Sequence, residues 1–354
     1  MKYPFKAALL IITMALTACA EESMEMAYFP GQDEKVQEKV WPAPPDVPRY
    51  RYAGLLTGEQ NFVPDKQNVS SKGEKFFRWL VGLGQGRIET RQLERPQAGM
   101  VGPDGRIYIT DVGKQAVVVF DVQENKLHIW DSTDANDKFL SPIGITTGSQ
   151  GEILVADSQL ARIIRLDSDG NPLGSFGKGI LQRPTGITSD PGSGYIYVAD
   201  TTAHDIKIFD KDGNLIDSFG QRGTGMGEFN GPTHLTFADR KLYVSDTLNA
   251  RIQVLTTDGE ALRSVGQRGL YIGNLTRPKG VTVDDDGNIY IVESYYDHLL
   301  VFNREGELLL PIGGSGDAVG DFFLPSGVWS DQQNRIYTAD MFNSRVVIMQ
   351  YLGN

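Results

Sequence analysis

The chain has 354 residues, of which 40% are hydrophobic and 22% are charged, a balance typical of a globular protein rather than a disordered one. The net charge of −11 excludes a globally basic surface for nucleic acid. The single cysteine excludes an internal disulfide, a cysteine-rich zinc site and haem attachment through paired cysteines.

The first 18 residues have the features of a secretory signal rather than of a folded element. Two lysines precede an apolar segment over 7–18, which is too short to span a bilayer as a helix. This segment ends in Leu16-Thr17-Ala18-Cys19, which resembles a bacterial lipobox, a motif whose cysteine thiol receives a diacylglycerol and becomes the new N-terminus. The alternative is a buried or fortuitous cysteine, but a sole cysteine at this offset favours the lipobox. We therefore expect a signal peptide over 1–18 and a lipid on Cys19.

We expect residues 19–48 to consist of the lipidated cysteine followed by a flexible tether. The segment is acidic at its start and contains four prolines over 42–48, a composition that buries little apolar surface. We expect it to hold the folded domain off the membrane. Ala20 resembles the outer-membrane sorting class of Gram-negative lipoproteins, so the expected location is the outer membrane of a bacterial cell envelope.

From about residue 95 to residue 354 the chain repeats. Six prolines recur at steps of 42 to 48 residues, and five of them open a Pro-x-(Gly/His)-(Ile/Leu/Val) start. Each start is followed by a short run of β-branched and aromatic residues that ends in an acid, such as Ile196-Tyr197-Val198-Ala199-Asp200. A third run and a fourth run, the latter often ending in glycine, complete the unit. The six prolines are Pro96, Pro142, Pro184, Pro232, Pro278 and Pro325.

Asp-Gly pairs between the runs supply the positive φ that tight hairpin turns need. Each unit therefore predicts four antiparallel strands over roughly 45 residues. Such a sheet cannot bury both faces alone, whereas units arranged radially can. The predicted fold is all-β, a six-bladed β-propeller of four-stranded antiparallel blades closed by an N-terminal strand.

The repeat resembles the NHL family. Pro-x-Gly-(Ile/Val), (Ile/Leu)-Tyr-Val-(Ala/Ser)-Asp and Asn-(Ala/Ser)-Arg-(Ile/Val) carry this likeness, and the closest single match is Asp246-Thr247-Leu248-Asn249-Ala250-Arg251-Ile252. The resemblance covers residues 95–354 and implies the propeller fold. It implies little about function, because propellers host many unrelated activities.

The last repeat stops after its third strand, so its fourth strand must come from residues 49–94, the closing strand and lead-in of the propeller. Two segments are candidates for this closing strand: residues 50–56 and residues 76–82. The first is preferred, and residues 72–81 would then form an amphipathic helix or an extra edge strand.

Antiparallel strands place the Pro-Gly starts and the acids at one end of the ring and the Asp-Gly turns at the other. The long loops over 221–231, 267–277 and 314–324 therefore gather on one face, where the central channel also opens. We expect this long-loop face to bind a ligand, and aromatic residues there could stack on carbohydrate. The candidates for ligand binding are Arg222, Arg268, Lys279, His234, His298, Tyr295 and Phe342, and those for carbohydrate stacking are Tyr271, Tyr295, Tyr296 and Phe342.

An acid ends the second run of every unit. These acids could hold a cation or a carbohydrate, but their presence in all six units favours a structural device that accepts backbone N–H groups and pairs with an Arg five residues later. Units one, three and five lack that Arg, so their acids are candidates to face a ligand. The six acids are Asp111, Asp157, Asp200, Asp246, Glu293 and Asp340.

His234 stands where other units have glycine, and it should line the mouth of the channel. With His204 and Asp200 or Asp246 it could form a divalent metal site. Peptidylglycine α-amidating lyase has a similar fold and uses channel histidines on zinc, but it places His directly after Pro, and the metal motif of gluconolactonase-like propellers is not found here. A lone channel histidine is more often a hydrogen-bonding residue, so His234, His204 and Glu293 are only candidate catalytic residues.

The pattern therefore favours a membrane-anchored envelope lipoprotein whose propeller binds a protein or polysaccharide partner through its long-loop face. The alternative is a metal-dependent lactonase or lyase with its site at the channel mouth. No cofactor is predicted except a divalent metal under that alternative. NHL propellers elsewhere bind RNA, but lipid anchorage outside the cytoplasm argues against a nucleic-acid partner.

Overall fold

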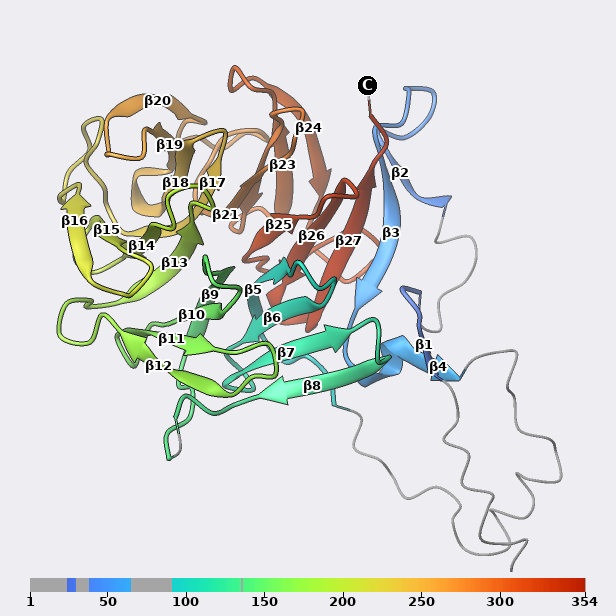
Figure 1. Cartoon of the computed structure of the whole chain (residues 1–354). Helices are drawn as coiled ribbons and strands as arrows, with labels where there is room; N and C mark the ends of the chain where they lie inside the picture. Colours follow the sequence, from blue (N-terminus) through green and yellow to red (C-terminus); the bar gives the residue numbers. More distant parts are fainter. Residues whose placement is uncertain (1–23, 30–37, 65–90, 135, 354) are drawn as a thin grey trace, which may run out of the picture.

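The computed structural model describes residues 24–29, 38–64, 91–134 and 136–353. In this part of the chain, six antiparallel sheets are arranged around a central axis, as predicted for a six-bladed propeller (Figure 1). The signal segment, Cys19 and residues 76–82 lie outside the described residues. No helix in the described ranges has the length and apolar character needed to cross a bilayer.

Blades one to five each hold four strands in chain order, from the axis outward. Their strands are β5 (Pro96–Val101), β6 (Ile107–Asp111), β7 (Ala116–Asp121) and β8 (Lys126–Trp130); β9 (Pro142–Thr147), β10 (Ile153–Asp157), β11 (Arg162–Leu166) and β12 (Pro172–Phe176); β13 (Pro184–Ser189), β14 (Ile196–Asp200), β15 (Asp205–Phe209) and β16 (Leu215–Phe219); β17 (Pro232–Ala238), β18 (Lys241–Asp246), β19 (Arg251–Leu255) and β20 (Ala261–Val265); and β21 (Pro278–Val283), β22 (Ile289–Glu293), β23 (His298–Phe302) and β24 (Leu308–Gly313).

Blade six joins the two ends of the chain. Its strands run in the order β25 (Val328–Ser330), β26 (Arg335–Asp340), β27 (Arg345–Tyr351), β3 (Tyr50–Leu56) and β2 (Val40–Trp41). The N-terminal β3 pairs antiparallel with the C-terminal β27, with Leu56 opposite Val346 and Tyr50 opposite Tyr351 (Figure 1). The preferred closing strand, 50–56, is therefore confirmed.

The expectation of a flexible tether over 19–48 is wrong for the described part of that segment. β1 (Met24–Met26) pairs with β4 (Phe62–Pro64), and β2 adds a fifth strand to blade six. Phe29 and Trp41 pack against the core cluster shared by blades five and six. The prediction rested on the prolines and acids of the segment and overlooked these apolar side chains. Their burial is sufficient to fix the segment on the propeller.

The glycine of the Pro-x-Gly start lets neighbouring inner strands approach the axis. A Cβ on Gly144 would lie 2.4 Å from the carbonyl oxygen of Thr185, and one on Gly280 would lie 2.5 Å from the amide nitrogen of Val328. Both contacts are with the backbone of the next blade, which cannot move aside cheaply. The repeated glycine is therefore a packing requirement of the closed ring.

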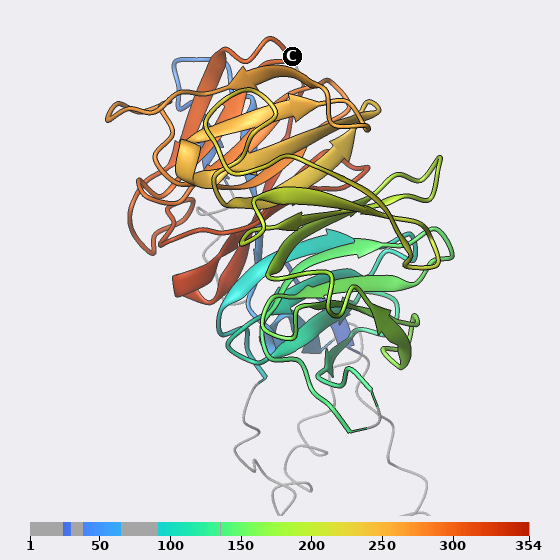
Figure 2. The same cartoon turned by 90° about the vertical axis from the view of Figure 1, so that its left-hand side faces the viewer.

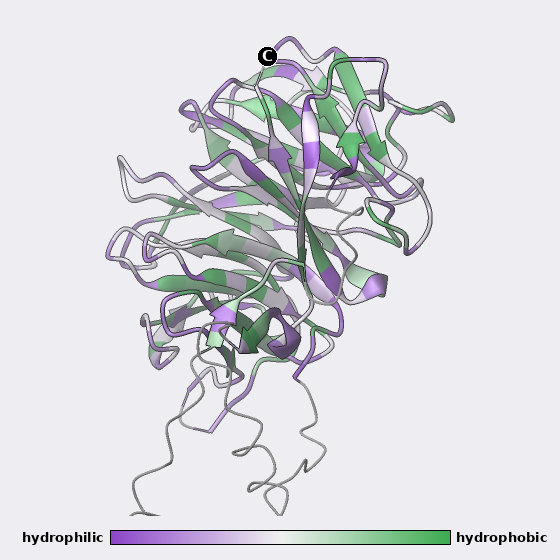
Figure 3. Ribbon diagram, turned by 90° about the vertical axis from the view of Figure 1, so that its right-hand side faces the viewer, coloured by the Kyte–Doolittle hydropathy of each residue, from purple (hydrophilic) through white to green (hydrophobic). Residues whose placement is uncertain are grey.

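The core lies between adjacent blades. Six clusters of buried side chains fill these spaces, and apolar residues lie mainly along the strands, whereas many connecting loops are polar (Figure 3). One of these clusters brings Leu56 of β3 together with Ile109 of blade one and Val346 of blade six. The N-terminal strand is thus part of the core and not an external addition.

Candidate functional site

Large apolar side chains are exposed in several loops of blades four to six. Leu270 and Tyr271 are 82% and 81% exposed, and Phe323 and Phe342 lie with their rings 5.4 Å apart at the surface. Large apolar side chains exposed in loops can mark interaction sites. We call this surface the apolar arc; its members are Leu248, Leu270, Tyr271, Ile272, Tyr295, Phe323 and Phe342.

The loop between β20 and β21 carries the most exposed part of the arc, and it extends outward from the ring (Figure 2). Its base is fixed, because the fully buried Leu275 donates its N–H to the carbonyl of Gln267 at 2.8 Å. A guanidinium nitrogen of Arg268 also donates to the carbonyl of Leu248 at 2.6 Å. The exposed tip over 270–272 is therefore held by a rigid support, as in binding loops generally.

The ring of acids has a structural role. In Asp157, the Oδ1 atom accepts the N–H groups of Gln159 and Leu160 at 3.0 and 2.9 Å, and Oδ2 accepts that of Leu140 at 2.8 Å. The carboxylate of Glu293 accepts the N–H groups of Thr276 and Arg277 in the same way. All six acids are buried, so each ties the loop entering its blade to the turn that follows it.

The expected arginine partner occurs only in some blades. Arg251 and Arg345 each lie 2.8 Å from the acid five residues before them, whereas Arg162 pairs with Asp137 instead of Asp157. The expectation that acids without an arginine face a ligand is wrong for Asp111, Asp200 and Glu293, because backbone N–H groups occupy their oxygens.

Two of the candidate histidines are held in turns. His204 has a positive φ of 60°, and its Nδ1 accepts the N–H of Gly231 at 3.0 Å. His298 Nδ1 contacts the carbonyl oxygen of Tyr296. These contacts explain both histidines without a ligand.

His234 lies in the channel. It lines an axial cavity of about 280 Å³ whose walls come from the inner strands of all six blades. His234 Nδ1 lies 3.0 Å from Thr233 Oγ1, and the buried Nε2 has no partner among the described residues. Burial, with the nearby charge of Lys279, lowers the pKa of His234 to about 3, so the imidazole is neutral at physiological pH.

The four predicted metal ligands do not converge. Within the described ranges, the single group of three potential ligands within binding distance of one another is Asp121, Glu124 and His128, on the outer hairpin of blade one. Asp121 already pairs with the Nε of Arg106 at 2.6 Å. His234, His204, Asp200 and Asp246 therefore lack the arrangement of a divalent metal site.

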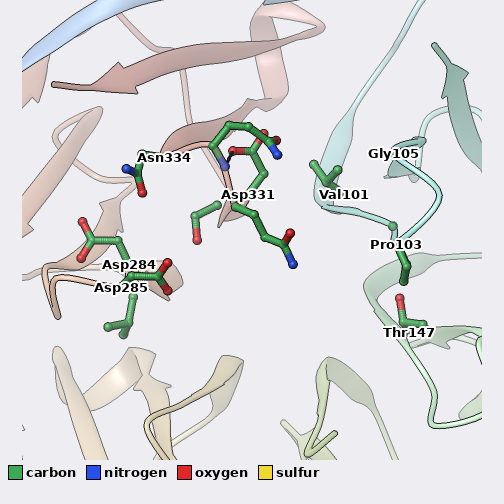
Figure 4. Close-up of a pocket in the computed structure, with 13 residues that line it drawn as sticks. Val101, Pro103, Gly105, Thr147, Asp284, Asp285, Asp331 and Asn334 are labelled. Carbon is green, nitrogen blue, oxygen red and sulfur yellow. Dashed lines mark hydrogen bonds between the residues drawn. The ribbon is translucent and has the colours of Figure 1, made fainter. Parts of the chain in front are cut away.

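A second cavity lies on the face opposite the long loops. A cavity of about 540 Å³ is formed there by the turns between the first and second strands of blades one, five and six. Asp284 and Asp285 lie on one side of it, and Val101 and Pro103 on the other (Figure 4). The Asp284 carboxylate accepts the hydroxyl of Tyr290 at 2.7 Å, so it is already occupied.

Sequence reasoning found Tyr271, Tyr295 and Phe342 of the apolar arc but missed Leu248, Leu270, Ile272 and Phe323. A signal was present, since Leu270-Tyr271-Ile272 stands between Gly269 and Gly273 in a loop. Arg222, a predicted binding residue, is exposed on the same face.

Comparisons with known proteins support the fold. No protein-family model matches the sequence, and a search of curated proteins found no match. Solved structures with a similar fold include virginiamycin B lyase from Staphylococcus aureus (17% identity, TM-score 0.53, 73% of this chain and 95% of that one) and a gluconolactonase from Xanthomonas campestris (17%, 0.55, 73% and 86%). An auxiliary nutrient binding protein from Bacteroides ovatus is similar as well (15%, 0.57, 73% and 69%). These neighbours share the β-propeller, and at such identities they show the fold alone.

Proposed function

We propose that the chain is a lipid-anchored envelope protein whose NHL-type propeller binds a partner protein through the apolar arc. The observation that carries this proposal is that seven large apolar side chains are exposed in the loops of blades four to six. Large apolar and aromatic side chains at the centre of a surface patch are typical of protein interfaces. Leu270 and Ile272 are aliphatic and cannot stack on sugar rings, which favours a protein over a polysaccharide.

The alternative is a metal-dependent lactonase or lyase acting at the channel mouth, as the named activities of two structural neighbours suggest. His234 lines the axial cavity, and its buried Nε2 has no partner among the described residues, which favours this alternative. Against it, the ring acids are occupied by backbone N–H groups. In addition, an ion on His234 would sit near the positive charge of Lys279, which disfavours a divalent cation.

The fold changes how the anchor is expected to work. Met24 is already paired in β1, and it follows Cys19 by five residues. Five residues span at most about 18 Å when fully extended. If Cys19 carries the lipid, the propeller is held close to the membrane, and its partner is one that reaches this zone of the envelope.

Site-specific photo-cross-linking in native envelopes tests the proposal. A photoreactive residue replaces Tyr271 of the arc in the full chain, and a matched variant replaces Tyr195, which is 39% exposed on the opposite face. We expect a discrete cross-linked species from position 271 that is absent from position 195. Equal products at both positions, or none at position 271, would refute the apolar arc as the binding surface.

A further inference from the structure

Exposed cations recur in the three successive loops that lead into blades three, four and five. These loops span 177–183, 220–231 and 266–277, and together they hold five cations and a single acid, in a chain whose net charge is −11. All five cations are exposed. We call this surface the basic sector; its cations are Lys178, Arg183, Arg222, Arg268 and Arg277.

Two turns of the same face connect the three loops. The turn between β14 and β15 donates an N–H to the carbonyl of Arg183 at 3.0 Å, and its histidine side chain accepts the N–H of Gly231 at 3.0 Å. The turn between β18 and β19 donates a side-chain amide to the carbonyl of Gly223 at 2.8 Å, and its backbone accepts an N–H of the Arg268 guanidinium at 2.6 Å. Each turn therefore contacts the loops on both of its sides, so the three loops are neighbours on one face.

Each of these loops is held in a fixed shape by the fold. Leu181, Phe229 and Leu275 are buried, and each donates its N–H to a carbonyl at the start of its own loop at 2.8 to 2.9 Å. The N–H groups of Arg183 and Arg277 also donate to the ring acids of their blades, at 2.8 and 3.0 Å. The cations are thus presented on preorganised supports, which lowers the entropic cost of binding.

The cations of the basic sector make no ion pair with a carboxylate of the described residues. On the opposite face, by contrast, Arg106 and Arg335 each lie 2.6 Å from a carboxylate oxygen. The one acid of the sector, Glu228, already accepts the N–H of Gly225 at 2.9 Å and the side-chain amide of Gln221 at 3.0 Å. Exposed guanidinium groups without a partner favour carboxylates, which they bind through two parallel hydrogen bonds.

The other loops of this face favour a polypeptide over an anionic membrane. The loops over 131–141 and 314–324 each contain two more acids than cations. A flat anionic bilayer that touched the basic sector would also meet these acidic loops, whereas a polypeptide can occupy the basic sector alone. The sector also exposes Ile180, Met226 and Tyr271, which suit a partner that carries apolar side chains beside its acids.

We propose that the partner of the apolar arc presents an acidic polypeptide segment with apolar side chains to the basic sector. This inference rests on the proposed function, because Leu270 and Tyr271 belong to the same loop as Arg268. It adds the chemistry of the partner: carboxylates on the partner pair with the exposed arginines, orient it and speed its association. Salt should weaken such an interface.

Photo-cross-linking from position 271 of the full chain in native envelopes tests the inference against a matched change of charge. Arg183→Gln with Arg222→Gln removes two cations of the basic sector, and Lys211→Gln with Arg240→Gln removes two exposed cations of the opposite face. The first pair should lower the yield of the cross-linked protein about threefold or more, and so should raising the salt to about 0.5 M. The second pair should leave the yield unchanged.

The outcomes separate this inference from the proposed function. Equal yields from the two variant pairs would overturn the basic sector as part of the interface and leave the apolar arc in place. Absence of a cross-linked protein in the native background would refute the proposed function itself. A product with the mass of a lipid adduct would assign this face to the membrane and overturn the inference. Circular dichroism and thermal unfolding check that the variants fold.

Fluorescently labelled poly-L-glutamate is a second probe, which does not require the native partner. At about 50 mM salt the full chain in detergent should bind it, and Arg183→Gln with Arg222→Gln should weaken this binding about threefold or more, unlike the control pair. The net charge of −11 disfavours such binding anywhere except at a local basic surface. Absence of binding, or equal binding by the two variant pairs, would contradict the inference even where the cross-linked protein is present.

Discussion

Shortening Leu56 to alanine tests whether the N-terminal strand closes the ring. Leu56 is fully buried in the cluster that joins β3 to blades one and six. The substitution removes three carbon atoms, which corresponds to about 2.4 kcal/mol of lost transfer free energy at about 0.8 kcal/mol for each. The cavity left between two blades adds to this, so we expect the free energy of unfolding to fall by about 3 to 4 kcal/mol.

Urea unfolding followed by tryptophan fluorescence and circular dichroism measures the change. Leu173→Ala is the matched control, because Leu173 is 59% exposed on the outer strand β12 and should change stability by less than about 0.5 kcal/mol. If β3 closes the ring, both probes should shift together in Leu56→Ala, because the loss destabilises the whole propeller. A loss below about 0.5 kcal/mol, or an early transition confined to a small part of the signal, would refute closure by this strand.

Three further predictions concern the ring and its channel. Asp157→Asn removes a charged acceptor of backbone N–H groups, so it should lower the free energy of unfolding by about 2 kcal/mol. The control Asp317→Asn, at an exposed position, should leave stability unchanged. Equal melting temperatures of the two variants would contradict the structural role of the acids. Gly280→Ala places a Cβ 2.5 Å from the Val328 amide nitrogen and should lower the free energy of unfolding by about 1 to 3 kcal/mol. The control Gly314→Ala meets open space and should leave stability unchanged. Unchanged stability of Gly280→Ala would show that the inner strands can separate. Since the pKa of His234 is about 3 when folded and about 6.5 when unfolded, the unfolded state binds the extra proton in this window. Stability should therefore fall by about 2 kcal/mol from pH 7 to pH 5 relative to His234→Gln, and parallel pH profiles of the two proteins would exclude a buried neutral histidine.

The propeller could be predicted because its repeat imposes strong local rules. The Pro-x-Gly starts reflect backbone contacts around the axis, as at Gly144 and Gly280, and the acids reflect turns that need an acceptor, as at Asp157. The acid recurs in every blade and the glycine in four of the six, so both are visible in a single sequence. The missing fourth strand of the last unit pointed in the same way to closure by an N-terminal strand, although the sequence left both 50–56, the preferred segment, and 76–82 as candidates.

The site was harder to predict, because partners distant in the chain decide what a side chain does. Glu293 and Asp200 looked free of their arginine partners, but backbone N–H groups satisfy them. Phe29 and Trp41 looked like parts of an unfolded tether, but the core clusters beside blade six accommodate them. Lys279 was predicted as a residue of the binding face, whereas its position beside His234 is a property of the fold alone.

Metal analysis of the full chain, purified without chelators, distinguishes the binding propeller from the metal-dependent enzyme. The neutral His234 beside Lys279 predicts substoichiometric zinc, calcium and other divalent ions, with no difference between the native protein and His234→Ala. One bound ion per chain that disappears in His234→Ala would contradict this interpretation and would place a metal-dependent reaction at the channel mouth.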